Sequence, residues 1–268
     1  MNGAYCGHVR TRYAPTPSGF LHIGNAANFV ATHLLAVEYG AQILLRIDDM
    51  DSDRFRTEYL EDIFEVLRWL DLPWDLGPSS SVDMATWCQS TRAERYRAAL
   101  ATLVDEGHAY LCSCSRSQWH SYHGEGCPGD CRNEKRRFEV TRTAWRLHYP
   151  AGPDPVVWRR DDLPAYHLTS VVDDDMWHVD LVVRGADLID ATNLQRYLSS
   201  LLPGSSFHAA TVGHHALITD DQGRKLSKSA GTQPSGLART DDNKVRILEW
   251  AAAFVAEISR DLPRSFGR

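Results

Sequence analysis

The chain has 268 residues, of which 43% are apolar and 24% charged, and its formal net charge is −6. This composition is typical of one large or two modest globular domains, and it excludes a disordered chain, a fibrous repeat and a small disulfide scaffold. The acidic balance also excludes a protein that coats nucleic acid with a general basic surface, while a local basic groove stays open.

The sequence holds no run of about eighteen apolar residues, so no membrane span is expected. Residues 1–12 are polar and lack an apolar core, which argues against a secretory signal and favours the cytoplasm. In that compartment the six cysteines are interpreted as thiols or metal ligands before disulfides.

The first part of the chain predicts alternating strands and helices. A strand over 8–14 runs into Pro15–Gly19, which cannot be helix interior, and a helix follows over 26–38. A short apolar run over 43–47 predicts a buried strand, and 52–70 predicts an amphipathic helix. This order is typical of a parallel α/β sheet.

The middle of the chain changes character after a helix predicted over 91–106. Residues 110–160 hold four cysteines, several glycines and prolines and a basic cluster, which indicates an insertion. The α/β pattern then resumes. Strands are predicted over 171–172 and 179–183, and helices over 191–201 and 242–260.

Two segments are candidate phosphate sites. In His22-Ile23-Gly24-Asn25 the glycine permits close backbone approach, the helix start offers N–H groups, and the imidazole can donate to a phosphoryl oxygen. In Lys225-Leu226-Ser227-Lys228-Ser229 two lysines form a cationic clamp for a leaving pyrophosphate. Each segment alone is more often structural, the first as a capped helix start and the second as a solvated basic loop.

In this order the two segments resemble the signatures of class I aminoacyl-tRNA synthetases, with Asn25 where a His is common. The resemblance is closest to the glutamyl branch and implies a Rossmann-like class I synthetase catalytic domain of α/β class with a zinc-containing insertion. Five stretches in the right order are similar to motifs of that branch, at 11–19, 46–51, 89–96, 166–174 and 183–188.

The tail after Ser229 is too short for an anticodon-binding domain, and in this the chain is similar to the glutamyl-queuosine tRNA(Asp) synthetases. That resemblance implies ATP-dependent activation of glutamate without tRNA, and transfer to queuosine in the anticodon stem-loop of tRNA(Asp). A monomer is expected. Its catalytic domain is expected in two segments, over 1–108 and 164–268. A zinc-binding insertion on the acceptor side is expected between them, over 109–163.

The predicted amino-acid site follows from the charges of glutamate. Arginine suits carboxylates because its fork is bidentate, so Arg12 and Arg184 are candidates, and the resemblance implies that Arg12 reads the side-chain carboxylate. Asp48 stands where the family has Glu and would meet the ammonium. It is one methylene shorter, which makes room for a different amino acid. The other predicted substrate-binding residues are Ala14, Thr16 and Tyr166.

The resemblance implies that the substrate carboxylate attacks the α-phosphate of ATP directly, so that no protein general base is required. The enzyme supplies positioning and charge stabilisation, with Mg²⁺ on the phosphates. The predicted catalytic residues are His22, Gly24, Lys225 and Lys228. The predicted ATP-binding residues are the same four together with Asn25 and Ser227.

Four cysteines lie within twenty residues, as Cys112-Ser113-Cys114 and Cys127-Pro128-Gly129-Asp130-Cys131. They match a closed structural zinc site, and unrelated thiols are the alternative. The resemblance strengthens the zinc interpretation, with Cys127 where that family usually has Tyr. The alternative ligands nearby are His120, Tyr122 and His123.

A basic cluster follows the cysteines. It is either a solvated face or a contact for the phosphate backbone of tRNA. Its members are Arg132, Lys135, Arg136, Arg137, Arg142 and Arg146.

Three other functions remain open. The chain could deliver an activated amino acid, glutamate or a different one, to an acceptor other than tRNA. It could be a binding paralog without catalysis, although His22 and Lys228 are intact. It could be a plain nucleotidyltransferase, although Arg12 and Arg184 suit an amino acid better.

Overall fold

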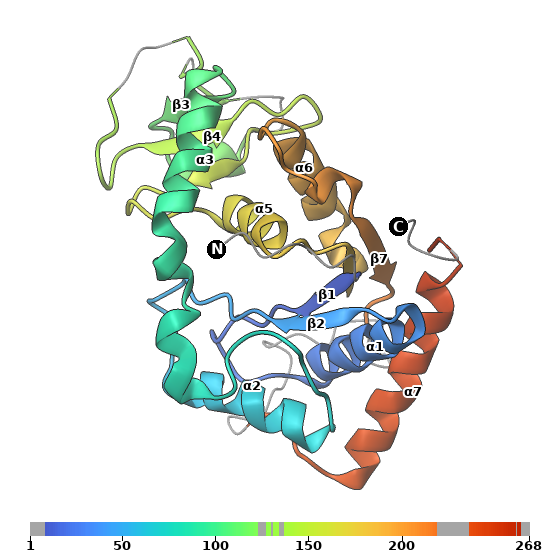
Figure 1. Cartoon of the computed structure of the whole chain (residues 1–268). Helices are drawn as coiled ribbons and strands as arrows, with labels where there is room; N and C mark the ends of the chain where they lie inside the picture. The colour runs from blue at the N-terminus through green and yellow to red at the C-terminus, as the bar shows by residue number, and fades with distance from the viewer. Residues whose placement is uncertain are drawn as a thin grey trace. The chain divides into compact units, whose positions relative to one another are not determined.

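The structure is a computed structural model, and it describes residues 9–122, 127–129, 131–133, 137–218, 236–260 and 262–263. In chain order the elements are β1 (Arg10–Tyr13), α1 (Ile23–Tyr39), β2 (Gln42–Leu45), α2 (Thr57–Trp69), α3 (Ala93–Asp105), β3 (Ala109–Cys112), α4 (Arg116–His120), β4 (Ala144–Leu147), β5 (Val156–Trp158), α5 (Tyr166–Met176), β6 (Leu181–Gly185), α6 (Ile189–Ser200), β7 (Thr211–His215) and α7 (Asp241–Ile258) (Figure 1). No helix among the described residues is long and apolar enough to cross a membrane.

Contacts divide the chain into two compact units. The first comprises residues 1–91, 178–190 and 209–268, and the second comprises 92–177 and 191–208. Both units are therefore assembled from segments that are distant in the sequence.

The first unit contains the parallel pairs that the sequence predicts. β1 pairs with β2, and β6 pairs with β7, both in parallel. The two pairs are neighbours, because the N–H of Asp180, just before β6, donates to the C=O of Arg10 in β1 at 2.8 Å. The prediction of an α/β fold with parallel strands is confirmed.

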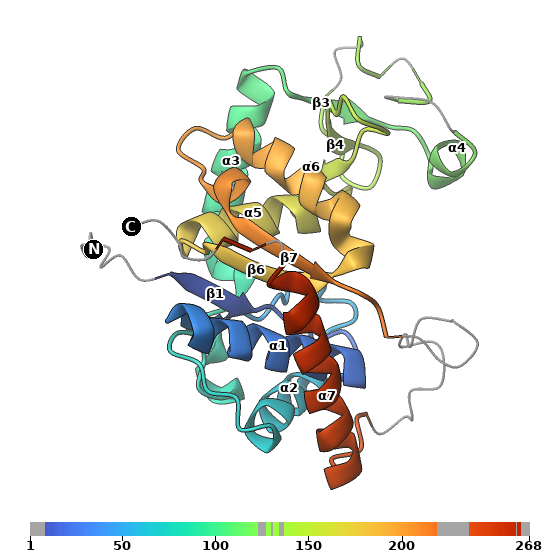
Figure 2. The same ribbon diagram turned by 90° about the vertical axis from the view of Figure 1, so that its right-hand side faces the viewer.

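Helices α1 and α7 pack side by side in this unit, as Figure 2 shows. The main apolar core lies between these helices, α2 and the first two strands, and it includes Phe29, Phe64 and Phe254. Strand β7 approaches α7 closely at Gly213, where a Cβ atom would overlap Cγ2 of Ile258. Only glycine therefore allows this distance between strand and helix.

The second unit is built on a three-stranded antiparallel sheet in the order β3-β4-β5. Tyr110 of β3 lies opposite Arg146 of β4, and Trp145 of β4 lies opposite Trp158 of β5. Helix α3 packs against α5 in the same unit.

The strand predicted at Val171–Val172 is wrong, because both residues lie in α5. Two adjacent β-branched residues favour a strand locally. The segment is a helix because Leu168, Val171 and Asp174 are buried at a spacing of three residues, which turns one helical face inward.

Candidate functional site

His22 is the N-cap of α1. Its Nδ1 atom accepts hydrogen bonds from the backbone N–H groups of Gly24, at 3.1 Å, and Asn25, at 3.3 Å. The Asn25 side chain returns a bond by accepting from the N–H of His22 at 3.1 Å. These three bonds form a capping box, so the structural role considered for His22 is present.

The cap also fixes the state of the imidazole. Because Nδ1 accepts two hydrogen bonds, the ring proton of neutral His22 belongs on Nε2. A side chain at Gly24 would place its Cβ 3.0 Å from Cε1 of His22, so any larger residue would press on the ring in this position. The cap therefore orients a potential N–H donor at the start of a helix, where the helix dipole favours anions.

The carboxyl ends of β1 and β2 carry most of the predicted amino-acid site. Backbone bonds continue past both strands, since the N–H of Arg46 donates to Tyr13 C=O and the N–H of Asp48 donates to Pro15 C=O, each at 2.9 Å. The segment with Asp48 thus runs beside the one that holds Ala14 and Thr16. Arg12, on β1, is buried.

Asp48 forms a buried bidentate ion pair with Arg46. Nε of Arg46 lies 2.7 Å from Oδ1, and Nη2 lies 3.1 Å from Oδ2. Sequence reasoning placed Asp48 against the substrate ammonium and missed this partner. The alternation Arg-x-Asp was the available signal, because residues two apart in extended backbone lie on the same side.

Arg184 of β6 is buried and lies opposite His214 of β7. The next residue along β7, His215, stacks on Phe254 of α7 with ring centroids 3.8 Å apart. Its Nε2 atom lies 3.0 Å from the Asn28 amide of α1, and Nδ1 lies 2.8 Å from the C=O of Ala216. Burial lowers the pKa of His215, against opposing effects of the Ala216 carbonyl and two carboxylates. The ring therefore joins β7, α1 and α7 as a neutral group.

Tyr166 lies in the second unit, at the first position of α5, with 45% of its surface exposed. The other residues predicted to bind the amino-acid substrate belong to the first unit, namely Arg12, Ala14, Thr16, Asp48 and Arg184. Lys225, Ser227 and Lys228 lie outside the described residues, so their predicted roles stay predictions.

A second buried ion pair joins two of the segments that resemble family motifs. Arg92 binds Asp173 of α5 with Nε at 2.7 Å and Nη2 at 3.1 Å, and the Tyr96 hydroxyl donates to the same carboxylate at 2.7 Å. Burial opposes the charge on Arg92, yet the bonds to Asp173 raise its pKa. Arg92 and Tyr96 are four apart on one helical face, which is the sequence signal for their shared partner.

The four predicted metal ligands converge in the second unit. The Sγ atoms of Cys112, Cys114, Cys127 and Cys131 all lie within 4.8 Å of one another. Three of the S···S distances are 3.6, 3.5 and 3.7 Å. A tetrahedral zinc ion with Zn–S bonds of about 2.3 Å needs sulfur atoms about 3.8 Å apart, so the donor set fits zinc.

Backbone groups support these sulfur atoms. The N–H of Cys114 donates to Cys112 Sγ at 3.4 Å, and those of Gly129 and Ser113 bond the sulfur atoms of Cys127 and Cys131. Such donors stabilise thiolates and orient metal ligands. A Cβ at Gly129 would lie 3.0 Å from Cys114 Sγ, so the turn packs closely on the cluster.

Asp154 fastens the cysteine segment to the sheet. It forms a bidentate pair with Arg132, accepts from the Tyr110 hydroxyl at 2.7 Å and accepts from the N–H of Tyr149 at 2.9 Å. Burial opposes ionisation, but these bonds outweigh it and hold the pKa of Asp154 below its ordinary value. Arg132, predicted as part of a basic patch, is thus engaged structurally. Lys135 and Arg136 lie outside the described residues.

Comparison with known proteins places this geometry in a family. The model described as "tRNA synthetases class I (E and Q), catalytic domain" matches residues 8–149 and 142–254. Two similar proteins are called glutamyl-Q tRNA(Asp) synthetase. That of Symbiobacterium thermophilum is 38% identical over 256 residues, and that of Nitratidesulfovibrio vulgaris is 36% identical over 254. Each match covers 82% of this chain and 78% of the relative.

Among solved structures, glutamate-tRNA synthetase from Elizabethkingia anophelis matches with a TM-score of 0.67 and 24% identity. The match covers 82% of this chain but 52% of that one, so this chain spans about half its length, and the likeness shows the fold.

The parallel sheet with an N-capped helix after its first strand is thus that of a class I synthetase catalytic domain. The chain belongs to the class I tRNA synthetase family for glutamate and glutamine, and it is a ligase of aminoacyl-tRNA synthetase type.

Proposed function

We propose that the enzyme activates glutamate with ATP in the absence of tRNA, and then transfers the glutamyl group to the queuosine of tRNA(Asp). One observation carries this proposal. The two relatives named glutamyl-Q tRNA(Asp) synthetase are 36% and 38% identical to the chain over most of either length. The cysteine cluster and the capped helix start are the geometry that supports it.

In the proposed activation step, an oxygen of the substrate α-carboxylate attacks the α-phosphorus of ATP. A new P–O bond gives glutamyl-adenylate, and the bond to the departing pyrophosphate breaks. His22, with its proton on Nε2, donates to a phosphoryl oxygen as charge develops there. Mg²⁺ would accompany the ATP phosphates and neutralise part of their charge. The role proposed for Lys225 and Lys228 is to hold the leaving pyrophosphate.

Recognition of glutamate rests on buried charges in the proposal. Arg12 binds the side-chain carboxylate, and Arg184 adds positive charge from β6. Asp48 receives the substrate ammonium while Arg46 holds the carboxylate in place. Tyr166 is proposed to contribute a wall and a hydroxyl.

The cysteine cluster is proposed to hold a structural zinc ion. Four cysteine ligands leave no open position for a substrate, so no catalytic role is assigned to the metal. Its chemistry would be to fold the segment around Cys127 and Cys131, which has little apolar core of its own.

A second candidate function is activation of a different amino acid, and the shorter Asp48 favours it. Its carboxylate is drawn toward Arg46, and the missing methylene leaves additional space at the ammonium position. The acceptor in this alternative is a nucleophile other than tRNA.

ATP–pyrophosphate exchange over a panel of amino acids, without RNA, tests the activation step. Exchange with glutamate alone supports the proposal, exchange with another amino acid supports the alternative, and no exchange contradicts both. Lys228→Ala is expected to slow exchange by about 10²-fold, as removal of a transition-state donor does. Lys244→Ala is the matched control, because Lys244 pairs with Asp71 on the surface.

Transfer is tested with radiolabelled glutamate and purified tRNA(Asp). The same tRNA with guanosine in place of queuosine is the control substrate. Label that enters only the queuosine form supports the proposed acceptor, and label in both forms or in neither contradicts it.

A further inference from the structure

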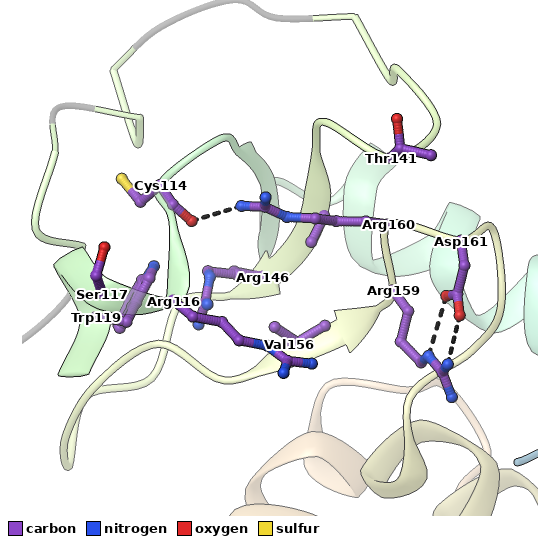
Figure 3. A pocket seen from close by; sticks show the side chains of 11 residues that line it. Cys114, Arg116, Ser117, Trp119, Thr141, Arg146, Val156, Arg159, Arg160 and Asp161 are labelled. Carbon is purple, nitrogen blue, oxygen red and sulfur yellow. Dashed lines mark hydrogen bonds and ion pairs between the residues drawn. The ribbon is translucent and has the colours of Figure 1, made fainter. Parts of the chain in front are cut away.

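A cavity of about 1020 Å³ opens beside the cysteine cluster in the second unit (Figure 3). It lies between α4, the sheet and the segment that follows β5, and Cys114 forms part of its wall. Four arginines and one aspartate line it, namely Arg116, Arg146, Arg159, Arg160 and Asp161. A chain with a net charge of −6 thus gathers an excess of positive charge at this site.

Two of these arginines are fixed by neutral partners. The guanidinium of Arg160 donates to the C=O of Cys114 at 2.5 Å, as the dashed line in Figure 3 marks. That of Arg146 lies 3.6 Å from the ring centre of Trp119 and donates to the C=O of Asp154. No carboxylate among the described residues pairs with either guanidinium group.

The four arginines divide into two roles. Arg146 is half-buried and lies over the Trp119 ring, so it offers a surface for stacking. Arg116 is exposed and makes no ion pair among the described residues. Arg159 pairs with Asp161, with 35% and 46% of the side chains exposed, and such surface pairs exchange partners at little cost.

The lining specifies the chemistry of a ligand. Planar guanidinium groups suit phosphate oxygens, and unpaired RNA bases stack on aromatic rings and on arginine planes. We propose that this cavity binds one unpaired nucleotide of the RNA substrate. Its phosphate is held by Arg116, Arg159 and Arg160, and its base lies against the Arg146–Trp119 stack. This inference rests on the proposed function, because it assumes an RNA substrate.

Binding of total tRNA to the full-length enzyme, measured by fluorescence anisotropy at several salt concentrations, tests the cavity. Arg116→Glu and Arg159→Glu are each expected to weaken binding by about tenfold. Each is also expected to reduce the slope of log affinity against log salt concentration by the amount that corresponds to about one phosphate contact. Arg95→Glu is the matched control. Arg95 lies exposed on α3 outside the cavity, carries the same charge change and is expected to alter binding by less than about twofold.

Two further measurements separate the possible failures. Exchange of pyrophosphate with glutamate and without RNA is expected to be unchanged in Arg116→Glu and Arg159→Glu, since neither residue belongs to the activation site. If the wild type binds tRNA but performs no exchange, the proposed function fails and the cavity proposal stands. Far-UV circular dichroism and zinc content verify that the variants are folded.

Titration with AMP and with inorganic phosphate distinguishes RNA from a free nucleotide or anion. An RNA site is supported if AMP or phosphate displaces tRNA only at concentrations far above that of the tRNA. The proposal is overturned if both charge-reversal variants bind tRNA like the wild type. It is equally overturned if AMP or phosphate binds tightly while tRNA binding is insensitive to the substitutions, or if wild-type enzyme binds no tRNA.

Discussion

Arg239 places Nη2 2.7 Å from Oδ1 of Asp62, and Oδ2 of the same carboxylate accepts the backbone N–H of Leu21 at 2.8 Å. Asp62, on α2, thereby ties the residue before His22 to the segment that leads into α7. Phe20 reinforces the connection, since a Cβ at Gly236 would lie 3.1 Å from its side chain. One buried carboxylate thus holds the entry of the capped helix against a distant part of the chain.

Asp62→Ala is expected to lower the free energy of unfolding by about 1–3 kcal/mol, because it leaves the buried Leu21 N–H without an acceptor. Burial raises the pKa of Asp62 despite bonds from Leu21 and Arg239. The cost of desolvating the carboxylate therefore offsets part of the stability that these bonds contribute. Urea denaturation at pH 7.5 measures the change. Glu65→Ala is the control, because Glu65 is the exposed second partner of Arg239 and is expected to matter by less than about 1 kcal/mol. Equal losses in the two variants would contradict the assignment.

Gly213→Ala is expected to destabilise the first unit by about 1–3 kcal/mol, because the new methyl group would overlap Ile258. Thermal unfolding measures the loss. Gly152→Ala serves as control, since its Cβ would meet only Tyr149 at an ordinary contact distance of 3.8 Å. A second substitution, Ile258→Ala, removes the overlapping methyl group. If the pair of substitutions is additive, the predicted overlap is refuted.

Wild-type protein is expected to carry one zinc ion per chain, and Cys131→Ser is expected to lose most of it, because one of four sulfur ligands is removed. Elemental analysis after dialysis measures this. Cys88→Ser is the matched control, since the Cys88 thiol bonds the C=O of Met84 and stands outside the cluster. Stoichiometric zinc in Cys131→Ser, or none in the wild type, would disprove the metal site.

The buried His215 gives the fold a dependence on pH. Because burial lowers its pKa in the folded state, the unfolded chain binds the proton more readily. The contribution of His215 to the stability of the fold is therefore fully present above its ordinary pKa of about 6.5, and it is lost as the pH drops below that value. His215→Gln is expected to flatten the dependence between pH 7.5 and 5.5, measured as urea midpoints. An identical pH profile in the variant would rule out His215 as its source.

Much of this architecture can be predicted from local sequence patterns. The apolar runs that become β2 and β6 are short and bounded by turn residues, which identifies them without tertiary information. The spacing of Cys112 and Cys114 against Cys127 and Cys131 equally predicts a cluster, because loops of that length close around one ion. The two interpretations considered for His22 are compatible, since the helix cap is what aims the ring.

Other features depend on partners that local patterns do not identify. Asp62 and Arg239 stand far apart in the sequence, and no local period links them. Arg46 begins one of the stretches that resemble family motifs, yet its pairing with Asp48 follows from extended backbone beyond the end of β2. The strand wrongly predicted at Val171–Val172 has the same origin, because packing of one helical face overrode a local β preference.

The hydrogen bonds between Arg10 and Asp180 span 170 residues, so β1 cannot complete its sheet until those residues have been synthesised. At about 5–20 residues per second, this interval is on the order of 10–30 s. During that time one side of β1 is an unpaired strand edge, which is the kind of surface on which nascent chains aggregate. The second unit, assembled largely from residues 92–177, emerges in the same interval. The architecture therefore sets an order of events in which the first half of the catalytic sheet must be kept from wrong partners while the inserted unit is synthesised.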